Sequence, residues 1–149
     1  MTTIEPPLAR ALAQKVRPTY TDPDRWRVFD DTFPTLDLLS AQGWTHVLLS
    51  NHVPELPEIV DHLGLTPRLS RLFNSGHTGY EKPHPRAFEI VVAAFPAAAP
   101  IWMIGDNPEA DVGGAEAVGI PAILVRRPGA DYAPSCATLA DVPAVVEMG

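Results

Sequence analysis

The stretch Ile101-Trp102-Met103-Ile104-Gly105-Asp106-Asn107-Pro108-Glu109-Ala110-Asp111 decides the fold of this chain. Its leading apolar run, bounded by proline and glycine, is typical of a buried strand in a parallel sheet covered on both faces. Asp106 would stand at the carboxyl end of this strand, where open α/β sheets bind their ligands. Pro108 starts a helix, so Asp111 lies in its first turn. We therefore expect both carboxylates to face one crevice.

Two carboxylates at this place suit a magnesium ion. Mg²⁺ takes one or two protein carboxylates and completes its shell with waters and a substrate phosphate. A structural role is the alternative, because acids also stabilise the start of a helix through its dipole. The stretch alone does not decide between these two interpretations.

Two upstream segments favour a phosphate site. Thr45 to Leu49 is a second buried-strand pattern, and it ends in Ser50 and Asn51. A serine there can hydrogen-bond a phosphoryl oxygen, although serine is also a common helix N-cap. Lys82 lies in a loop between flexible glycines and a rigid Pro-x-Pro unit. Its ammonium is a compact point charge that can neutralise phosphate, whereas most lone loop lysines are merely solvated.

The order of these elements is more specific than any one of them. Ser50 after a strand, Lys82 before a proline, and Gly105-Asp106 with Asp111 resemble the second, third and fourth motifs of the haloacid dehalogenase-like (HAD) hydrolase superfamily. The resemblance covers roughly residues 26 to 145. It implies an α/β protein with the HAD-like Rossmannoid three-layer fold and a parallel sheet, with its cap reduced to one N-terminal helix.

The resemblance also implies roles for individual residues. Ser50 and Lys82 would be the catalytic side chains, with Ser50 holding the transferring phosphoryl group and Lys82 steadying its charge. Asn51 would join them in binding phosphate. Asp106 and Asp111 would bind Mg²⁺ as the cofactor. The implied function is Mg-dependent phosphoryl transfer of the phosphatase type on a small phosphorylated molecule.

The first motif of the superfamily, an apolar strand followed by Asp-x-Asp-x-Thr, is missing upstream of Ser50. The nearest acids, Asp30 and Asp31, are adjacent, so on a strand they would point to opposite sides. We interpret them as helix-entry acids. The protein is then truncated or catalytically impaired, unless another chain supplies the nucleophile. The alternative is a non-catalytic magnesium- and phosphate-binding or regulatory module. A receiver-like phospho-acceptor domain is a remote alternative. Such a domain places its acceptor aspartate before the hydroxyl and the lysine, whereas Asp106 follows Ser50 and Lys82 in this sequence.

Composition and charge limit which kinds of protein this sequence can encode. A length of 149 residues with 46% hydrophobic content suits one folded domain. A net charge of −7 argues against nucleic-acid partners and anionic membranes. A single cysteine excludes an internal disulfide framework. The sequence shows neither a signal-peptide pattern nor a membrane-length apolar stretch, which predicts a cytoplasmic location.

We expect two regions along the sequence. Residues 1–25 would hold the remnant cap helix, from Leu8 to Val16, and a connector, and residues 26–149 the HAD-like core without its first strand. In the HAD-like fold that strand lies between the strands ending at Ser50 and Ile104, so its absence leaves a gap in the sheet. Direct pairing of the two strands, an inserted segment or cover from a partner chain would close it, and we favour a homodimer.

Overall fold

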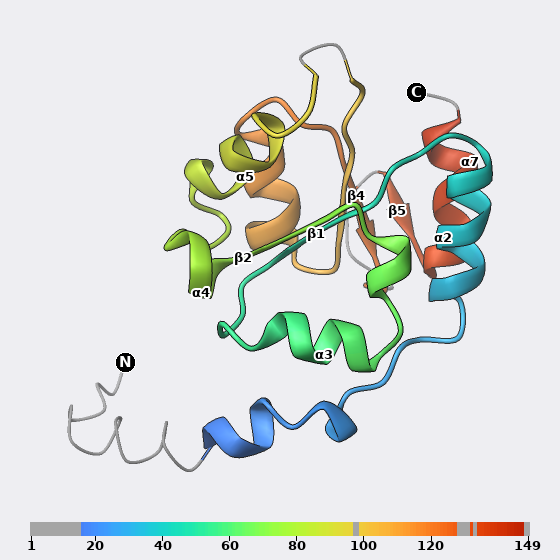
Figure 1. Ribbon diagram of the computed structural model, residues 1–149. Coiled ribbons are helices and arrows are strands. Elements are labelled where there is room, and N and C mark those ends of the chain that lie inside the picture. The colour runs from blue at the N-terminus through green and yellow to red at the C-terminus, as the bar shows by residue number, and fades with distance from the viewer. Residues whose placement is uncertain (1–15, 97–98, 128–131, 133, 148–149) are drawn as a thin grey trace.

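The computed structural model describes residues 16–96, 99–127, 132 and 134–147. Its strands form two separate parallel sheets, and the α/β class is confirmed (Figure 1). The strands are β1 (Val47–Ser50), β2 (Arg71–Asn74), β3 (Met103–Gly105), β4 (Ala122–Val125) and β5 (Ser135–Cys136). The order is β1-β2 in one sheet and β3-β4-β5 in the other.

Helices follow the strands, as the proline and glycine punctuation predicted. The α-helices are α2 (Thr32–Ala41), α3 (Leu56–His62), α4 (Ser75–Thr78), α5 (Pro85–Val92), α6 (Gly114–Glu116) and α7 (Val142–Val146). Shorter 3₁₀ turns are η1 (Pro23–Arg25), η2 (Thr66–Arg68) and η4 (Leu139–Asp141), and the segment η3 (Pro108–Gly113) is a π-helix. No helix within the described ranges has the length and apolar character needed to cross a bilayer.

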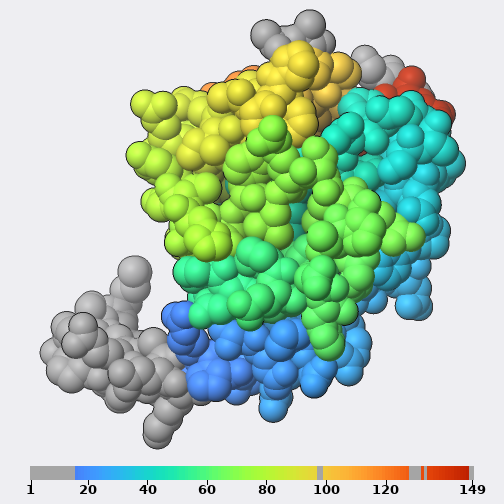
Figure 2. All heavy atoms as spheres, viewed as in Figure 1, coloured from blue at the N-terminus to red at the C-terminus, as the bar shows by residue number. Residues whose placement is uncertain are grey.

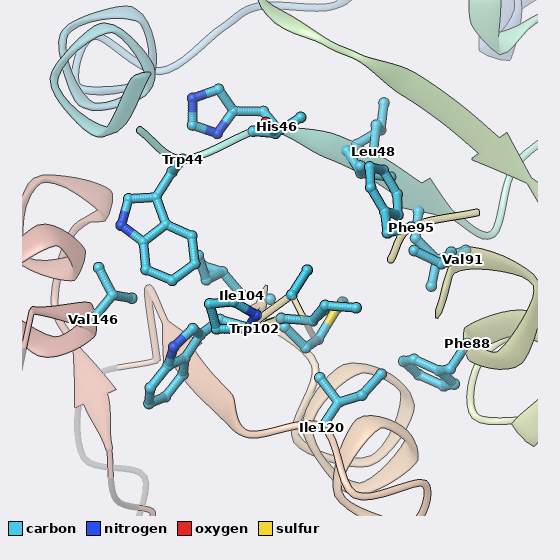
Figure 3. Close-up of a pocket in the computed structure, with 18 of the residues that line it drawn as sticks. Trp44, His46, Leu48, Phe88, Val91, Phe95, Trp102, Ile104, Ile120 and Val146 are labelled. Carbon is cyan, nitrogen blue, oxygen red and sulfur yellow. The ribbon is translucent and has the colours of Figure 1, made fainter. Parts of the chain in front are cut away.

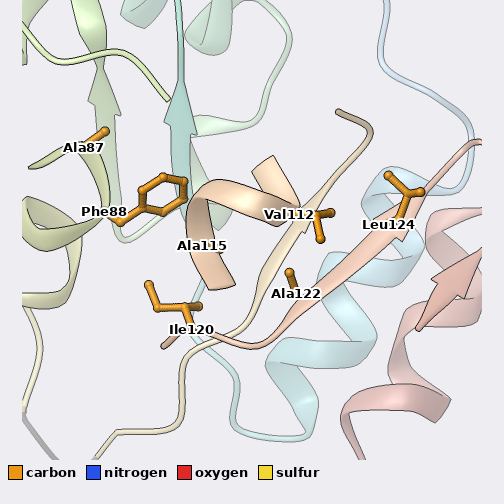
Figure 4. Packing of buried hydrophobic residues seen from close by; sticks show 7 residues of the cluster. All are labelled: Ala87, Phe88, Val112, Ala115, Ile120, Ala122 and Leu124. Carbon is orange, nitrogen blue, oxygen red and sulfur yellow. The ribbon is translucent and has the colours of Figure 1, made fainter. Parts of the chain in front are cut away.

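Two packed layers cover the larger sheet. The side chains of β4 alternate between them: Ala122 and Leu124 join the cluster under α5 and α6, whereas Ile123 and Val125 join the cluster under α2 and α7. Figure 4 shows the first cluster, with the Phe88 ring of α5 against the helix that carries Val112 and Ala115. All four residues of β4 are buried. This is the predicted three-layer arrangement.

The structure differs from the local expectations in three places. The residues that follow Val16 were expected to be a connector, but residues 17–20 are helical and η1 follows; Leu8 to Lys15 lie outside the described residues. A helix does start at Pro108, as expected, but its first turns are the π-helix η3, with the N–H of Val112 donating to Asn107 C=O at 3.3 Å. The loop after β2 contains α4, which Asn74 caps by accepting from the N–H of His77.

The N-terminal described segment lies along α3 (Figures 1 and 2). Arg17 forms an ion pair with Glu55, just before α3. The Tyr20 ring stacks on His52 with centroids 4.6 Å apart, and Trp26 meets Tyr20 edge-on. These contacts attach the segment to the core, while its assignment as a remnant cap stays a prediction.

Asp31 stands at the start of α2, as expected for a helix-entry acid, but its side chain does not cap that helix. Its carboxylate accepts hydrogen bonds from Arg126, directly after β4, and from the N–H of Leu139 at 2.8 Å, at the start of η4. The Arg126 guanidinium also lies 3.8 Å from the centre of the Phe29 ring. Asp31 therefore connects three elements that are distant in sequence.

The gap in the sheet is real. β1 and β3 are not hydrogen-bonded to each other, and no described strand lies between them. Both strands are half-buried along their whole length, in contrast to the fully buried β4. Among the described residues the two strands therefore do not pair directly, and no described strand is inserted between them, while the homodimer stays a prediction.

We predict that Asp31→Asn lowers stability in a pH-dependent way. Burial raises the pKa of Asp31, but the hydrogen bonds from Arg126 and the Leu139 N–H outweigh burial and hold the pKa below its ordinary value. The stabilisation is therefore present above the unfolded pKa of about 4 and is lost as the pH falls through the folded pKa. At neutral pH the substitution should lower the free energy of unfolding by about 1–2 kcal/mol.

Urea unfolding at pH 7 and at successively lower pH measures this difference. Asp30→Asn is the matched control, because Asp30 is exposed and adjacent. An Asp31→Asn deficit that stays constant down to the lowest pH at which the protein folds would contradict the proposed role of the Asp31 carboxylate.

Candidate functional site

A buried ion pair forms the centre of the site. The Lys82 Nζ donates to Asp111 Oδ1 at 2.6 Å and to the C=O of Leu49 at 2.8 Å. The two side chains are 11% and 8% exposed. Since Leu49 belongs to β1 and Asp111 follows β3, the ammonium lies between the carboxyl ends of the two sheets.

Gly105 makes room for this pair. The second carboxylate oxygen of Asp111, Oδ2, accepts the N–H of Asn107 at 3.0 Å, so the carboxylate lies directly against the end of β3. A Cβ built on Gly105 would overlap the Asp111 carboxylate. A side chain at residue 105 is thus incompatible with the observed position of Asp111, which gives the Gly-Asp sequence a steric reason.

Asn51 positions the lysine loop. Its Oδ1 accepts the N–H of Lys82 at 2.8 Å, and its Nδ2 donates to the C=O of Lys82 at 2.9 Å. The Asn51 side chain thus pairs with both backbone groups of Lys82, which attaches the lysine loop to the end of β1. The sequence placed Asn51 among the phosphate ligands; the contact seen here is a positioning contact, and phosphate binding by Asn51 stays a prediction.

Ser50 and Asp106 end their strands at the same edge. Ser50 is the last residue of β1 and is half-buried, and Asp106 follows β3 and is exposed. The Nε of Arg127, which follows β4, donates to the backbone carbonyl oxygen of Asp106 at 2.7 Å. Sequence reasoning missed this contact, although the two residues follow neighbouring strands.

The donor set fits a magnesium ion held mainly by Asp106. Both oxygens of Asp111 already accept hydrogen bonds, from Lys82 and from the Asn107 N–H. Over the ranges that the structure describes, no group of three or more His, Cys, Asp or Glu side chains forms a metal cage. Mg²⁺ does not need one, because it keeps several waters and shares substrate phosphate oxygens. Each of these oxygens keeps a further lone pair, so ligation by Asp111 stays a prediction beside that by Asp106.

Asn107 has a local structural role. Its side chain accepts the N–H groups of Glu109 and Ala110 at 3.0 and 2.9 Å, which caps the π-helix η3. Together with the bond from its own N–H to Asp111, this cap fixes the turn that carries both acids. The close spacing of Asp106 and Asp111 is thus built by one capped turn.

We predict that Gly105→Ala displaces the Asp111 carboxylate and weakens the ion pair with Lys82. Overpacking of this kind should lower the free energy of unfolding by about 1–3 kcal/mol, and the amide resonance of Asn107 should shift because its acceptor moves. Gly113→Ala is the control, because its Cβ meets nothing closer than the Pro108 C=O at 3.4 Å and alanine favours a helix. Equal stability of the Gly105→Ala variant and the wild type would contradict the tight packing at Gly105.

Comparisons with known proteins identify the family. The sequence profile of the haloacid dehalogenase-like hydrolases matches residues 4–119. The phosphoserine phosphatase of Thermus thermophilus is 34% identical over 124 residues, which are 82% of this chain and 49% of that protein. The ribulose-1,5-bisphosphate 5-phosphatase of Halopiger xanaduensis is 33% identical over 96 residues, 63% of this chain and 40% of that protein.

A solved structure shows the shared fold. The HAD phosphatase from Thermococcus onnurineus superposes with a TM-score of 0.73 at 22% identity, over 93% of this chain and 64% of that one. The protein spans about half the length of the curated relatives it matches. The family profile and the relative of 34% identity together show that this chain belongs to the haloacid dehalogenase-like hydrolase family.

Proposed function

We propose that this protein provides the phosphate- and magnesium-binding part of a phosphohydrolase that acts on a small phosphorylated molecule. The observation that carries the proposal is the Lys82 ammonium, held between the ends of β1 and β3 by Asp111 and the Leu49 C=O. Ser50 and the exposed Asp106 end the same two strands. Two relatives with related sequences carry the names of phosphatases, which supports this choice of chemistry.

The residues suit phosphoryl transfer. In that reaction, charge spreads over the equatorial oxygens of the phosphoryl group, and catalysis depends on positioning and on cations. The Lys82 ammonium supplies one fixed positive charge, which its two acceptors hold in place. The Ser50 hydroxyl donates a hydrogen bond to a phosphoryl oxygen. Asp106, with Asp111 near it, would hold Mg²⁺, and the bound ion would neutralise further phosphate charge.

We assign no nucleophile among the described residues. Asp30 is exposed, and the Asp31 carboxylate is occupied by Arg126 and the N–H of Leu139. Neither acid is among the residues that line the cleft between β1 and β3. We therefore propose that covalent catalysis needs a carboxylate from outside these residues. Without it, the same site acts as a magnesium- and phosphate-binding module, which is the second candidate function.

We predict that the isolated protein hydrolyses para-nitrophenyl phosphate no faster than its Asp106→Asn variant. Without a nucleophile the covalent route is missing, and the remaining electrostatic contacts give little turnover. Release of para-nitrophenol at saturating Mg²⁺ measures this. Magnesium-dependent turnover that the substitution abolishes would overturn the assignment and return Asp30 or Asp31 as the candidate nucleophile.

We also predict that the protein binds Mg²⁺ weakly, at millimolar concentration, because one free carboxylate and waters make a loose site. NMR titration should shift the amide resonances of residues 105–111. Asp106→Asn should abolish the shifts, whereas Glu109→Gln, which changes an exposed acid of the same turn, should preserve them. Resonances of the wild type that stay unchanged even at about 10 mM metal would argue against both candidate functions.

A further inference from the structure

We propose that Arg127 is a positioning residue for the magnesium site. It holds the peptide unit between Asp106 and Asn107 in one orientation, and this unit adjoins the carboxylate that would bind the ion. This role rests on the proposed function, because it takes Asp106 as the main ligand of Mg²⁺. Arg127 follows a different strand, β4, and it acts through the backbone of Asp106 rather than as a ligand.

Side chains hold both polar groups of this peptide unit. The Nε of Arg127 donates to the C=O of Asp106 at 2.7 Å. The N–H of Asn107 donates to Asp111 Oδ2 at 3.0 Å. Because a trans peptide unit is planar and its C=O and N–H point in opposite directions, the two bonds hold it from opposite sides. We call this arrangement the peptide clamp.

The peptide clamp lies just beyond the end of the strand ladder. β3 pairs with β4 only as far as Gly105, which lies opposite Leu124. The other side of β3 faces a cavity of about 600 Å³, and no described strand lies there. The backbone of Asp106 is thus outside the ladder, so side chains rather than a neighbouring strand fix its orientation.

Most of the side chains that line this cavity are apolar. Figure 3 shows Trp44 and Leu48 on the β1 side and Trp102 and Ile104 on the β3 side. A carboxylate that turned toward such walls would lose its hydration, which is costly for a charge. The direction of the Asp106 side chain therefore decides whether it can meet a hydrated ion. The lysine and aspartate side chains that line the cavity are Lys82, Asp106 and Asp111.

The conformation of Arg126 explains how the next residue reaches this peptide unit. Arg126 has a φ of 59°, in the left-handed region that residues other than glycine rarely adopt. Its guanidinium bonds to the Asp31 carboxylate and lies 3.8 Å from the centre of the Phe29 ring. Such a conformation persists where surrounding contacts impose it. The two arginines therefore contact different elements, Arg126 at the start of α2 and Arg127 after the end of β3.

The positive charge of Arg127 and its hydrogen bond have opposite effects on the ion. A guanidinium near a divalent cation repels it, so removal of the charge alone should strengthen Mg²⁺ binding. Loss of the hydrogen bond releases the peptide unit next to Asp106, which should weaken Mg²⁺ binding. A pair of substitutions at Arg127 separates the two effects.

Arg127→Met and Arg127→Gln form this pair. The glutamine Nε2 lies as many bonds from Cα as the arginine Nε, so Arg127→Gln keeps an N–H donor without the charge, whereas Arg127→Met keeps the length without a donor. We expect NMR titration with Mg²⁺, in the absence of phosphate, to give a dissociation constant about tenfold higher for Arg127→Met. Arg127→Gln should stay within about twofold of the wild type or bind more tightly.

Hydrogen exchange of the Asn107 amide, without metal, gives an independent measurement. Its N–H forms the second bond of the peptide clamp, so Arg127→Met should speed its exchange about tenfold, whereas Arg127→Gln should leave it unchanged. Arg86→Met is the control for loss of an exposed arginine, because Arg86 pairs with Glu89 on α5. It should change neither the exchange rate nor the Mg²⁺ affinity.

Three results would overturn the proposal. Mg²⁺ binding by Arg127→Met that equals or exceeds that of the wild type would leave Arg127 no positioning role. An equal loss of affinity in Arg127→Met and Arg127→Gln would show that the hydrogen bond is not the cause. Unchanged exchange of Asn107 in Arg127→Met would mean that the peptide unit does not depend on Arg127. In these cases the wild type still binds Mg²⁺, whereas a wild type that binds none would overturn the proposed function as well.

Discussion

The buried ion pair between Lys82 and Asp111 joins the two halves of this protein. Lys82 comes from the loop before α5, Asp111 comes from the turn after β3, and the same ammonium contacts the last part of β1 through Leu49. No described strand crosses from one sheet to the other, so side chains must hold the two sheet ends in place. Removal of one partner from a buried pair costs about 3–5 kcal/mol because the other charge stays unpaired. Gly105 leaves space for the Asp111 carboxylate, and Asn51 holds the loop that carries Lys82.

The charges at the end of the cleft give the proposed function a division of labour. The Asp111 carboxylate pairs with the Lys82 ammonium at 2.6 Å. The Arg127 guanidinium contacts the backbone of Asp106, whose own carboxylate is exposed. Two cations and two carboxylates thus balance here. Under the proposed function, a divalent cation on Asp106 would supply the further positive charge that attracts a phosphate.

The elements that the sequence predicted well are those with long apolar runs and clear boundaries. The apolar residues before Ser50 and before Gly105 became β1 and β3, and the spacing of the later acids placed Asp111 at the end of β3. The two-residue strand β5 is too short for any pattern, and no periodicity distinguishes a π-helix over six residues from an α-helix. The roles of Asn51 and Asp31 depend on partners 31 and 95 residues away, which no local pattern indicates. The gap in the sheet was foreseen only from the family resemblance.

The division of the sheet has a consequence for how the protein folds. The ladder of β1 and β2 lies within residues 47–74, and that of β3, β4 and β5 lies within residues 103–136. Each ladder is continuous in sequence, so its backbone bonds close only short loops. The helices are not divided in the same way, because α2 precedes β1 in the sequence but packs on β4 through Leu39. The larger sheet therefore obtains part of its cover from the far side of the smaller ladder in sequence, and side-chain packing rather than a shared ladder makes the molecule one unit.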